Sequence, residues 1–380
     1  MKVALLTTDN REHERTYEEA KPRFGPAIES VLDGLSRVPG LELHVIACTQ
    51  RPMPAPEKLS DNTWFHLLHV PKIGWLRTGY QGCVRAVRHR LRSLQPDLVH
   101  GQGTERDCAL SAVFSGFPNV VTIHGNMSAV AKSVGARIGS YLWCAAQIER
   151  FAVSRTNAIF CNSRYTESLV RRSSRRTFRV ANAVRRPFLE TPLTQRSNSE
   201  KPILLNIGVV APRKRQLDVL TVAETLHKAG RRFEMQFIGL ASPRSLYARN
   251  FLARIKRAEA AGYASYLGHL TTEALIERLD SASALVHFPA EEAFGLVVAE
   301  ALARNLKFFG ARVGGLPDIA EGIEGAELFD PNDGSGMVEA IGQWLQRGAL
   351  LPRDAASEMR LRYHPDVIAQ RHVEIYREIL

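Results

Sequence analysis

Short apolar runs alternate along the chain with stretches in which apolar residues recur every three or four positions. The runs are continuous and lack the every-second-residue alternation of strands that have one face in water. They therefore predict parallel strands covered on both faces and separated by helices. The predicted strands are residues 2–8, 43–48, 97–100, 119–123, 158–162, 203–209, 234–239, 284–288 and 306–310. Such alternation is typical of doubly wound α/β domains.

Both halves of the chain begin in the same way. An apolar run at 2–8 and another at 202–210 each lead into a polar loop and then into an amphipathic helical pattern. The apolar helix faces are Ile28, Val31, Leu32 and Leu35 in the first half and Leu217, Leu220, Val222, Ala223 and Leu226 in the second. The repeated opening predicts two Rossmann-like domains.

The length of 380 residues is comfortable for two domains, and a hydrophobic content of 45% gives each of them a core. A turn-rich polar stretch at 186–200 is the best linker candidate. We therefore expect an N-terminal domain over 1–185, a C-terminal domain over 201–364 and a last helix over 365–380.

No membrane-spanning or secretory segment is evident in the sequence, and we therefore expect the protein in the cytoplasm. No apolar run approaches the roughly 18–20 residues that a membrane-spanning helix needs. The strand-like start at 1–6 is too short and too quickly polar for a secretory signal. The five cysteines, Cys48, Cys83, Cys108, Cys144 and Cys161, form no C-x-x-C pair. We expect reduced, mostly buried thiols and assign them no chemistry.

The positive charge of the chain is confined to its first half. The net charge is +11; residues 1–190 hold 27 Lys and Arg against 16 Asp and Glu, whereas residues 191–380 hold 23 of each. The densest arginine stretch runs from 164 to 186. It could attract phosphate, anionic lipid or nucleic acid, or it could be a solvated face. The aromatic–basic interleaving of single-strand binders is not evident there, which disfavours nucleic acid.

The most specific candidate motif in the sequence is a pair of glutamates, Glu292 and Glu300, in the segment 288–302. A strand ends at Phe288, an acidic loop follows, and a helix is predicted to start near Gly295. Helix N-termini attract phosphate, and glycine lets a ligand approach the backbone closely. An ordinary helix N-terminus would explain Glu292. It does not explain a carboxylate at Glu300 among apolar neighbours.

Two further groups are placed at strand ends. Arg213 and Lys214 follow the first strand of the second half, where positive charge can neutralise a ligand phosphate; the alternative is a solvated basic loop. Arg215 is expected to point elsewhere. His124 ends a strand of the first half and could form a hydrogen bond near neutral pH, although a lone histidine is more often structural. The loop 314–318 enters a helix through two glycines and is weak evidence alone.

These residues resemble the retaining glycosyltransferases of family 4, which have the two-domain GT-B fold. Glu292 and Glu300 match the E-x7-E motif of that family, and Arg213 and Lys214 resemble its donor-phosphate pair. Other matching segments are Tyr266–Gly268, Pro96–His100 and Asn182–Val184. The resemblance covers nearly the whole chain. It implies two Rossmann-like domains that face each other across a cleft, with the last helix crossing back to the first domain.

The resemblance also implies an activity: transfer of a sugar from a UDP- or GDP-sugar to an acceptor hydroxyl, with retention and without a metal or other cofactor. Glu292 would bind donor-sugar hydroxyls, and Glu300 the ribose. Arg213 and Lys214 would stabilise the leaving diphosphate, and His124 would contact the transferred sugar. The other donor-binding residues that the resemblance assigns are Gly25, Leu270, Ala293, Phe294, Gly295 and Leu296.

The chain departs from the family pattern in two places. The long charged loop over residues 8–26 holds one glycine, Gly25, where many members have a Gly-Gly loop, and residues 305–309 replace a more usual small-residue stretch. Acceptor recognition is therefore expected to be unusual. The atypical loop and the basic first half together suggest a phosphorylated or lipid-linked acceptor and a peripheral location at the inner membrane face. Two alternatives are a non-catalytic nucleotide-sugar-binding protein and a nucleotide-sugar epimerase.

Overall fold

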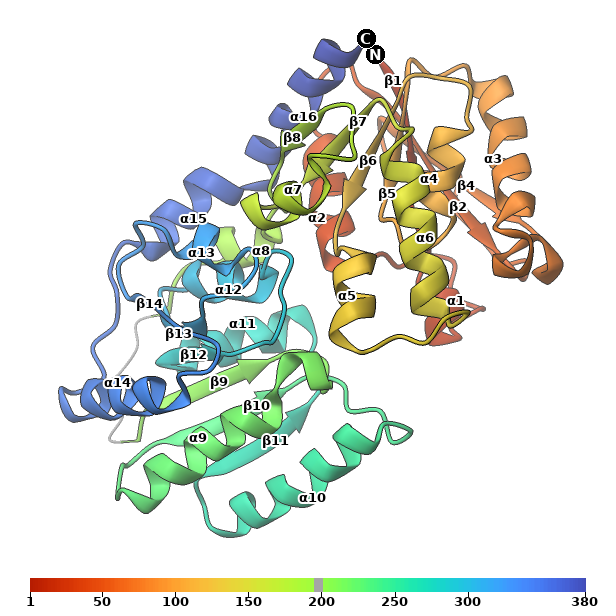
Figure 1. Cartoon of the computed structure of the whole chain (residues 1–380). Coiled ribbons are helices and arrows are strands. Elements are labelled where there is room, and N and C mark those ends of the chain that lie inside the picture. The colour runs from red at the N-terminus through yellow and green to blue at the C-terminus, as the bar shows by residue number, and fades with distance from the viewer. Residues whose placement is uncertain (195–200) are drawn as a thin grey trace. The chain divides into compact units, whose positions relative to one another are not determined.

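The computed structural model describes residues 1–194 and 201–380 and divides them into two compact α/β units (Figure 1). The first unit joins Met1–Ala183 with Pro365–Leu380, and the second is Val184–His364. Residues 186–194 of the predicted linker therefore fall in the second unit, while residues 195–200 lie outside the described residues. The fold class predicted from the apolar runs is confirmed.

The described part of the first unit contains an eight-stranded sheet in the order β3-β4-β2-β1-β5-β6-β7-β8. All neighbouring strands are parallel except β3 and β4. The strands are β1 (Lys2–Leu6), β2 (Glu42–Thr49), β3 (Lys58–Ser60), β4 (Thr63–His69), β5 (Leu98–Gln102), β6 (Asn119–Ile123), β7 (Ala158–Cys161) and β8 (Thr177–Arg179). The helices are α1 (Arg11–Glu14), α2 (Pro26–Leu35), α3 (Gln81–Leu94), α4 (Asp107–Val113), α5 (Met127–Ser133), α6 (Tyr141–Val153), α7 (Arg164–Val170) and α16 (Pro365–Ile379), with 3-10 turns η1 (Lys72–Gly74) and η2 (Leu76–Thr78).

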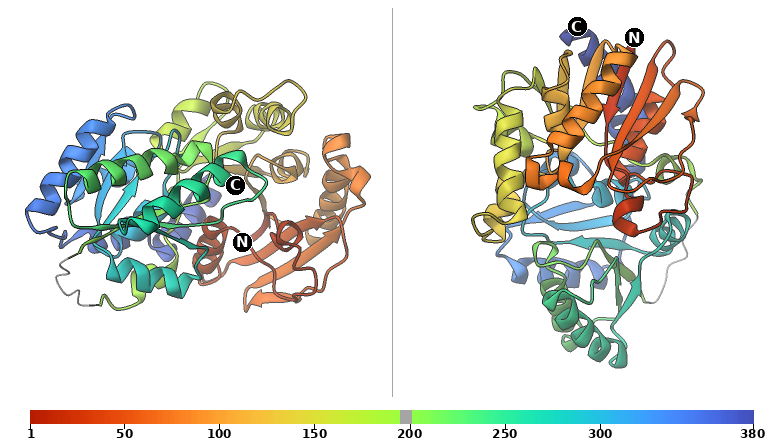
Figure 2. Two further views of the ribbon diagram at one scale, coloured as in Figure 1. Left: turned by 90° about the horizontal axis from the view of Figure 1, so that it is seen from below. Right: turned by 90° about the vertical axis from the view of Figure 1, so that its right-hand side faces the viewer.

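Helices cover both faces of this sheet, as the continuous apolar runs require. Along β1, Ala4 and Leu6 point into a core shared with α3, α4 and α6. Val3 and Leu5, which alternate with them, point into a second core shared with α2 and α16. The last helix thus packs on the first unit, and the two chain termini lie near each other there (Figure 1 and Figure 2).

In its described residues the second unit is built around a six-stranded parallel sheet in the order β11-β10-β9-β12-β13-β14. Its strands are β9 (Ile203–Ile207), β10 (Glu234–Ile238), β11 (Ala264–Gly268), β12 (Ala284–His287), β13 (Lys307–Ala311) and β14 (Ala326–Phe329). Its helices are α8 (Arg186–Glu190), η3 (Pro212–Lys214), α9 (Gln216–Lys228), α10 (Leu246–Ala260), α11 (Thr272–Ser281), α12 (Leu296–Leu302), α13 (Leu316–Ala320), α14 (Gly334–Gln346) and α15 (Ala355–Tyr363). Helices α9, α10 and α14 share one core with the sheet.

Each sheet has a point at which the strand order reverses. In the first unit β1 and β5 are neighbours, and in the second β9 and β12 are neighbours. At such a switch point the connections leave the two central strands in opposite directions, which opens a crevice at their carboxyl ends where ligands bind. The fold therefore singles out the loops that follow these four strands. We found no helix in the described residues that is long and apolar enough to cross a membrane.

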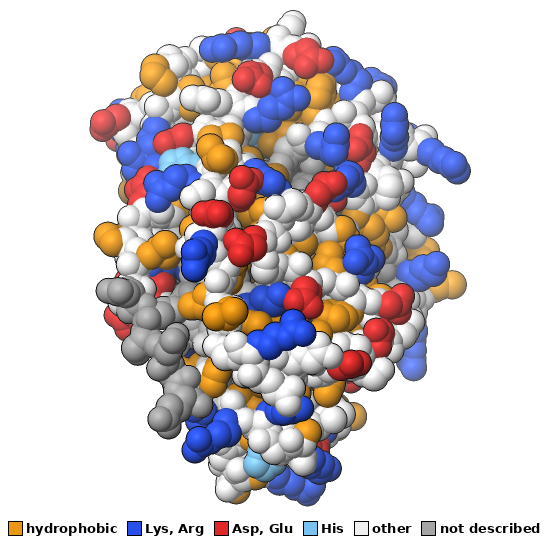
Figure 3. Space-filling model, turned by 90° about the vertical axis from the view of Figure 1, so that its left-hand side faces the viewer, with side chains coloured by type: hydrophobic (Ala, Val, Ile, Leu, Met, Phe, Trp, Pro, Cys, Tyr) orange, Lys and Arg blue, Asp and Glu red, His pale blue; other side chains and the backbone are white. Residues whose placement is uncertain are grey.

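The arginine stretch of the first half does not form a uniform patch. Arg171, Arg172 and Arg175 are exposed, whereas Arg179 pairs with Glu167 and Arg176 pairs with a carboxylate of α16. Basic and acidic side chains are also interspersed on the face shown in Figure 3. The positive charge available to a partner is therefore smaller than the sequence count implies.

A buried hydrogen-bonded chain runs from the last helix to the carboxyl edge of the first sheet. The Tyr376 hydroxyl lies 2.6 Å from Nδ1 of His100, and the Gln102 side-chain amide lies 3.1 Å from Nε2 of the same ring. The Oε1 of Gln102 accepts from Nε2 of His124 at 2.8 Å. Burial lowers the pKa of His100 and of His124, so both rings are neutral near pH 7.

We expect His372 on α16 to make the protein less stable in mild acid. Burial lowers the pKa of His372 to about 4, from the ordinary 6.5. A depressed pKa contributes stability above the unfolded value, and this is lost as the pH falls. Between about pH 7 and about pH 5 the loss is about 2 kcal/mol. Urea unfolding at both pH values should show a smaller fall for His372→Gln than for the wild type.

The exposed His69 supplies the control for this experiment. His69→Gln should lose as much stability on acidification as the wild type does. An equal fall in the wild type and in His372→Gln would show that His372 does not titrate with unfolding.

Candidate active site

Two loops meet at the switch point of the second sheet. One follows β9 and contains η3; the other follows β12 and leads into α12. The backbone N–H of Ala290 in the second loop donates to the carbonyl oxygen of Arg213 in the first, at 2.8 Å. This bond joins the predicted basic pair to the predicted acidic loop. Residues 77 positions apart in sequence are thereby placed at one edge of the sheet.

Lys214 and Glu292 form a partly buried ion pair between these loops. Lys214 Nζ contacts Oε2 of Glu292, and the two side chains are 13% and 14% exposed. Nε2 of His287, at the end of β12, lies 3.1 Å from the same oxygen. Burial alone would raise the pKa of Glu292, but Lys214 and His287 outweigh burial and hold the pKa of that carboxyl well below its ordinary value. Glu292 is therefore ionised throughout the physiological range.

The charged residues next to this ion pair, Arg213 and Glu291, have fewer hydrogen-bond partners. The Arg213 guanidinium has no hydrogen-bond partner among the residues that the structure describes, and Oε1 of Glu291 is buried without one. Burial raises the pKa of Glu291, and the charge of Glu292 adds to that shift. Buried polar groups are nearly always hydrogen-bonded, and orphaned ones concentrate where a ligand supplies the partner. Arg215 points elsewhere, as expected, and donates to the carbonyl oxygen of Pro331 at 2.8 Å.

The start of α12 lies where the sequence predicts it. Gly295 is the N-cap, with a φ of 105° that favours glycine, and the helix begins at Leu296. Ala293 and Phe294 are buried beside it. These four residues stand next to Glu292 at the switch point, where the resemblance assigns them to donor binding.

Glu300 is buried inside α12, at 3% exposure, and is paired with a residue that the sequence analysis did not connect to it. Its Oε1 accepts from Nε of Arg185 at 2.7 Å, and the same guanidinium donates to Thr272 Oγ1 at 2.9 Å. Burial raises the pKa of Glu300, and Arg185 offsets part of that shift. Within the described residues the other oxygen, Oε2, has no hydrogen bond.

The glycine loop 314–318 supports Glu292 from behind. The N–H of Gly315 donates to the carbonyl oxygen of Glu292 at 2.9 Å. Gly314 has a φ of 55°, and a Cβ there would lie 1.7 Å from that same oxygen. Only glycine fits a backbone contact this close. The loop that was weak evidence as a sequence pattern therefore fixes the position of the acidic loop.

The other predicted site residues lie away from these two loops. His124 and Gly25 belong to the first unit. Nδ1 of His124 is buried and lacks a hydrogen-bond partner in the described part of the chain. Gly25 is the N-cap of α2 with a φ of −70° and open space around its Cβ position, so neither conformation nor packing requires glycine there. Leu270 is half-buried in the loop between β11 and α11 of the second unit.

Comparison with known families decides the identity of this arrangement. The family model described as glycosyl transferases group 1 matches residues 191–361, and the model described as glycosyltransferase family 4 matches residues 28–185. The chain is a glycosyltransferase. None of the curated proteins matches the sequence of this glycosyltransferase. The predicted resemblance and the predicted enzyme class are confirmed.

Solved structures show that the glycosyltransferase has the GT-B fold. Sucrose-phosphate synthase from Thermosynechococcus elongatus aligns over 100% of this chain and 99% of its own, with a TM-score of 0.76 and 17% identity. Anabaena HepE in complex with UDP-glucose aligns over 100% of both chains, with a TM-score of 0.72 and 15% identity. The lipopolysaccharide outer core galactosyltransferase WaaB also aligns over 100% of both chains, with a TM-score of 0.71 and 14% identity.

Proposed function

We propose that this glycosyltransferase takes its sugar from a UDP- or GDP-sugar and transfers it to an acceptor hydroxyl with retention of the anomeric configuration. The observation that carries the proposal is the joined pair of loops that sets Lys214 and Arg213 beside Glu292. Cations stabilise the charge that develops on a departing diphosphate, and an ionised carboxylate accepts hydrogen bonds from sugar hydroxyls.

The two cations have different parts in this proposal. Arg213 has no protein partner in the described residues, so its planar guanidinium is available to bind two phosphate oxygens. Lys214 is paired with Glu292 and lies between the sugar-binding carboxylate and the diphosphate. Together they supply the positive charge that a divalent metal supplies in other transferases. We therefore propose transfer that does not need a metal at the diphosphate.

Glu300 is proposed to bind the ribose. Arg185 holds Oε1 and favours the charged form of this buried carboxyl, which leaves Oε2 to accept hydrogen bonds from a pair of ribose hydroxyls. The depth of Glu300 and the ion pair behind it give the carboxylate one fixed orientation. A buried, oriented acceptor discriminates strongly against a ligand that lacks the hydroxyl.

Retention is proposed to occur on one face of the sugar without a covalent intermediate. Glu292 is held by Lys214 and His287, so we assign it to binding and orientation and not to nucleophilic attack. His124 is proposed to contact the transferred sugar. Its Nε2 proton is committed to Gln102, so the free Nδ1 is an acceptor for a sugar hydroxyl.

The proposal is tested first by a thermal-shift screen against UDP-, GDP- and ADP-sugars. A bound donor raises the melting temperature by mass action. HepE, which shares the fold, was solved with UDP-glucose, and this supports placing UDP-sugars first in the screen. The best donor should then release its nucleoside diphosphate without stimulation by added Mg²⁺ or Mn²⁺. NMR of the glycoside formed should show the anomeric configuration of the donor.

Three outcomes would contradict parts of the proposal. Binding without turnover, across a panel of acceptors, would favour a non-catalytic sugar-nucleotide-binding protein. An epimerised nucleotide sugar formed without an acceptor would favour an epimerase. An inverted product would overturn retention while leaving the donor assignment intact.

We further propose that the acceptor carries phosphate or lies at an anionic membrane surface. The exposed Arg171, Arg172 and Arg175 support this, as does Ile138, which exposes 86% of its surface between α5 and α6. Co-sedimentation with vesicles should increase with their anionic lipid content and fall with salt. Binding that is independent of anionic lipid would contradict the membrane part of the proposal.

A further inference from the structure

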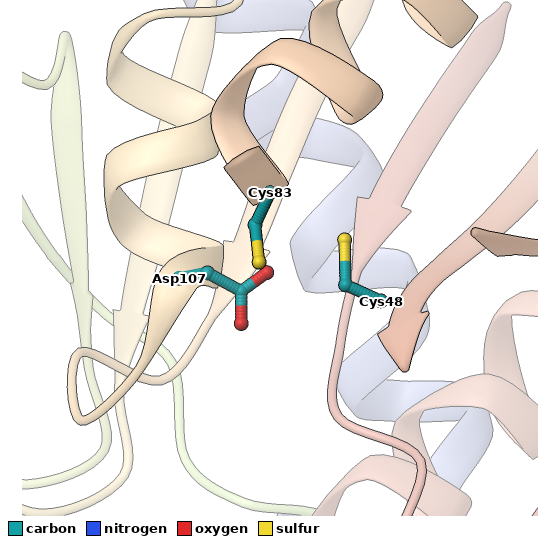
Figure 4. Close-up of side chains that lie close together, drawn as sticks. All are labelled: Cys48, Cys83 and Asp107. Carbon is teal, nitrogen blue, oxygen red and sulfur yellow. The ribbon is translucent and has the colours of Figure 1, made fainter. Parts of the chain in front are cut away.

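Three side chains with the chemistry of metal ligands meet in the first unit (Figure 4). Cys48 lies near the end of β2, Cys83 in the first turn of α3, and Asp107 at the first position of α4. Both sulfur atoms and a carboxylate oxygen lie within 4.8 Å of one another. The three residues come from separate elements, and none of them is among the residues assigned to donor binding.

The cluster is buried. Cys83 is 0% exposed, and Cys48 and Asp107 are each 6% exposed. A carboxylate taken out of water is costly unless a cation compensates its charge. Among the described residues no Lys, Arg or His forms an ion pair with Asp107 within 4.0 Å. Surface carboxylates often cluster without binding a ligand. A buried carboxylate next to two thiols is less common, and a bound cation would account for it.

Figure 4 shows the Cys83 thiol next to the Asp107 carboxylate and the Cys48 side chain across from both. The cluster sits at the carboxyl edge of the sheet. β2 borders β1 there, and α4 follows β5, which is the other strand of the switch point.

We propose that Cys48, Cys83 and Asp107 bind a zinc ion. Thiolate and carboxylate oxygen together suit Zn²⁺, whereas Mg²⁺ and Ca²⁺ take oxygen ligands alone. With Zn–S bonds of about 2.3 Å, tetrahedral geometry places two sulfur ligands about 3.8 Å apart. The observed limit of 4.8 Å requires side-chain movements of at most about 1 Å.

The Cys83 thiol and burial raise the pKa of the Cys48 thiol, and burial raises the pKa of Asp107, so zinc binding would release protons from these groups. Cys83 lies in the first turn of the 14-residue helix α3. That turn is held tightly, since a Cβ on Gly82 would lie 2.5 Å from the Cα of Gly74 in η1. Two thiolates and a carboxylate leave one negative charge on a zinc complex. The positive charge of Arg106, which acts on Asp107, would balance it.

The proposed ion would join β2, α3 and α4 at a single point and leave a fourth position for a water molecule. The site does not depend on the proposed transfer reaction, because it uses other residues of another unit. Its occupancy can therefore be measured without any donor or acceptor.

The test is the metal content of the purified full chain. Protein produced with zinc in the medium should carry one zinc ion per chain by inductively coupled plasma mass spectrometry, and Cys48→Ser and Cys83→Ser should each reduce this to background. Protein refilled with Co²⁺ should show the near-ultraviolet absorption of cobalt–thiolate bonds, which Asp107→Asn should shift. Circular dichroism of each variant shows whether it is folded.

Matched controls are available in the same chain. Cys144→Ser and Cys161→Ser alter cysteines outside the cluster and should keep the zinc content of the wild type. Equal zinc content in all variants would overturn the proposal, and so would the absence of zinc from the folded wild type. A Cys48–Cys83 disulfide, found by mass spectrometry in protein purified without reductant and not convertible to a zinc form on reduction, would overturn it as well.

Discussion

Lys214→Ala is expected to slow the release of nucleoside diphosphate by about 100- to 1,000-fold. Lys214 is proposed to neutralise charge on the departing diphosphate, and removal of one preorganised donor at such a position has an effect of this size. The substitution also takes away the main partner of the buried Glu292 carboxylate. The loss should therefore appear in kcat, with a smaller fall in donor affinity.

Arg215→Ala is the matched control for this prediction. Arg215 is the next residue in the chain and carries the same charge, but it pairs with Asp218 and the carbonyl oxygen of Pro331. Its removal changes the net charge of the loop by the same amount and should change kcat by less than about 3-fold. If both variants lost activity equally, the effect would come from general charge and the assignment of Lys214 would be wrong.

Gly314→Ala is expected to lower kcat/KM by about 100-fold without changing any group that touches the substrate. The new Cβ would lie 1.7 Å from the carbonyl oxygen of Glu292, so the acidic loop has to move by more than about 1 Å. The left-handed conformation adds about 1–2 kcal/mol of strain. Steady-state kinetics with the identified donor and a urea unfolding curve measure the two effects separately.

Gly334→Ala controls for the loss of a glycine as such. Gly334 opens α14, its φ is not left-handed, and a Cβ there meets nothing within 4 Å. This variant should be as active as the wild type and slightly more stable, because alanine has fewer conformations to lose on folding. Unchanged kinetics in Gly314→Ala would mean that the loop 314–318 does not position Glu292.

The central strands of both sheets were predictable because burial on two faces leaves a continuous apolar run. All nine predicted runs overlap an observed strand. The strands that were missed, β3, β4, β8, β11 and β14, lie at or next to the sheet edges, where half-exposed and polar side chains interrupt the run. β4 has the sequence Thr-Trp-Phe-His-Leu-Leu-His. Its polar residues interrupt the apolar run, and only the folded structure shows which of its side chains are buried.

Side-chain contacts between residues far apart in the sequence were not predictable. Glu300 was identifiable as a carboxylate among apolar neighbours, but its partner Arg185 precedes it by 115 residues and looked like one member of a basic stretch. His287 ends a buried apolar strand, and a titratable residue there was a signal that sequence analysis could have used. Cys48, Cys83 and Asp107 share no spacing, since β2, α3 and α4 meet only in the folded sheet.

The chain of contacts from Tyr376 to His124 has a consequence for how this family varies. His100 sits between the tyrosine and Gln102, and the amide of Gln102 sets which ring nitrogen of His124 carries the proton. A change at any of these positions is expected to require a compensating change at the next, because a buried polar group without its partner is costly. Residues 100, 102 and 376 should therefore covary among homologues, and a relative with phenylalanine at 376 should also lack the histidine at 100. The residue type at 376 in the last helix would then depend on the residue type at 100, which lies 276 positions earlier in the sequence.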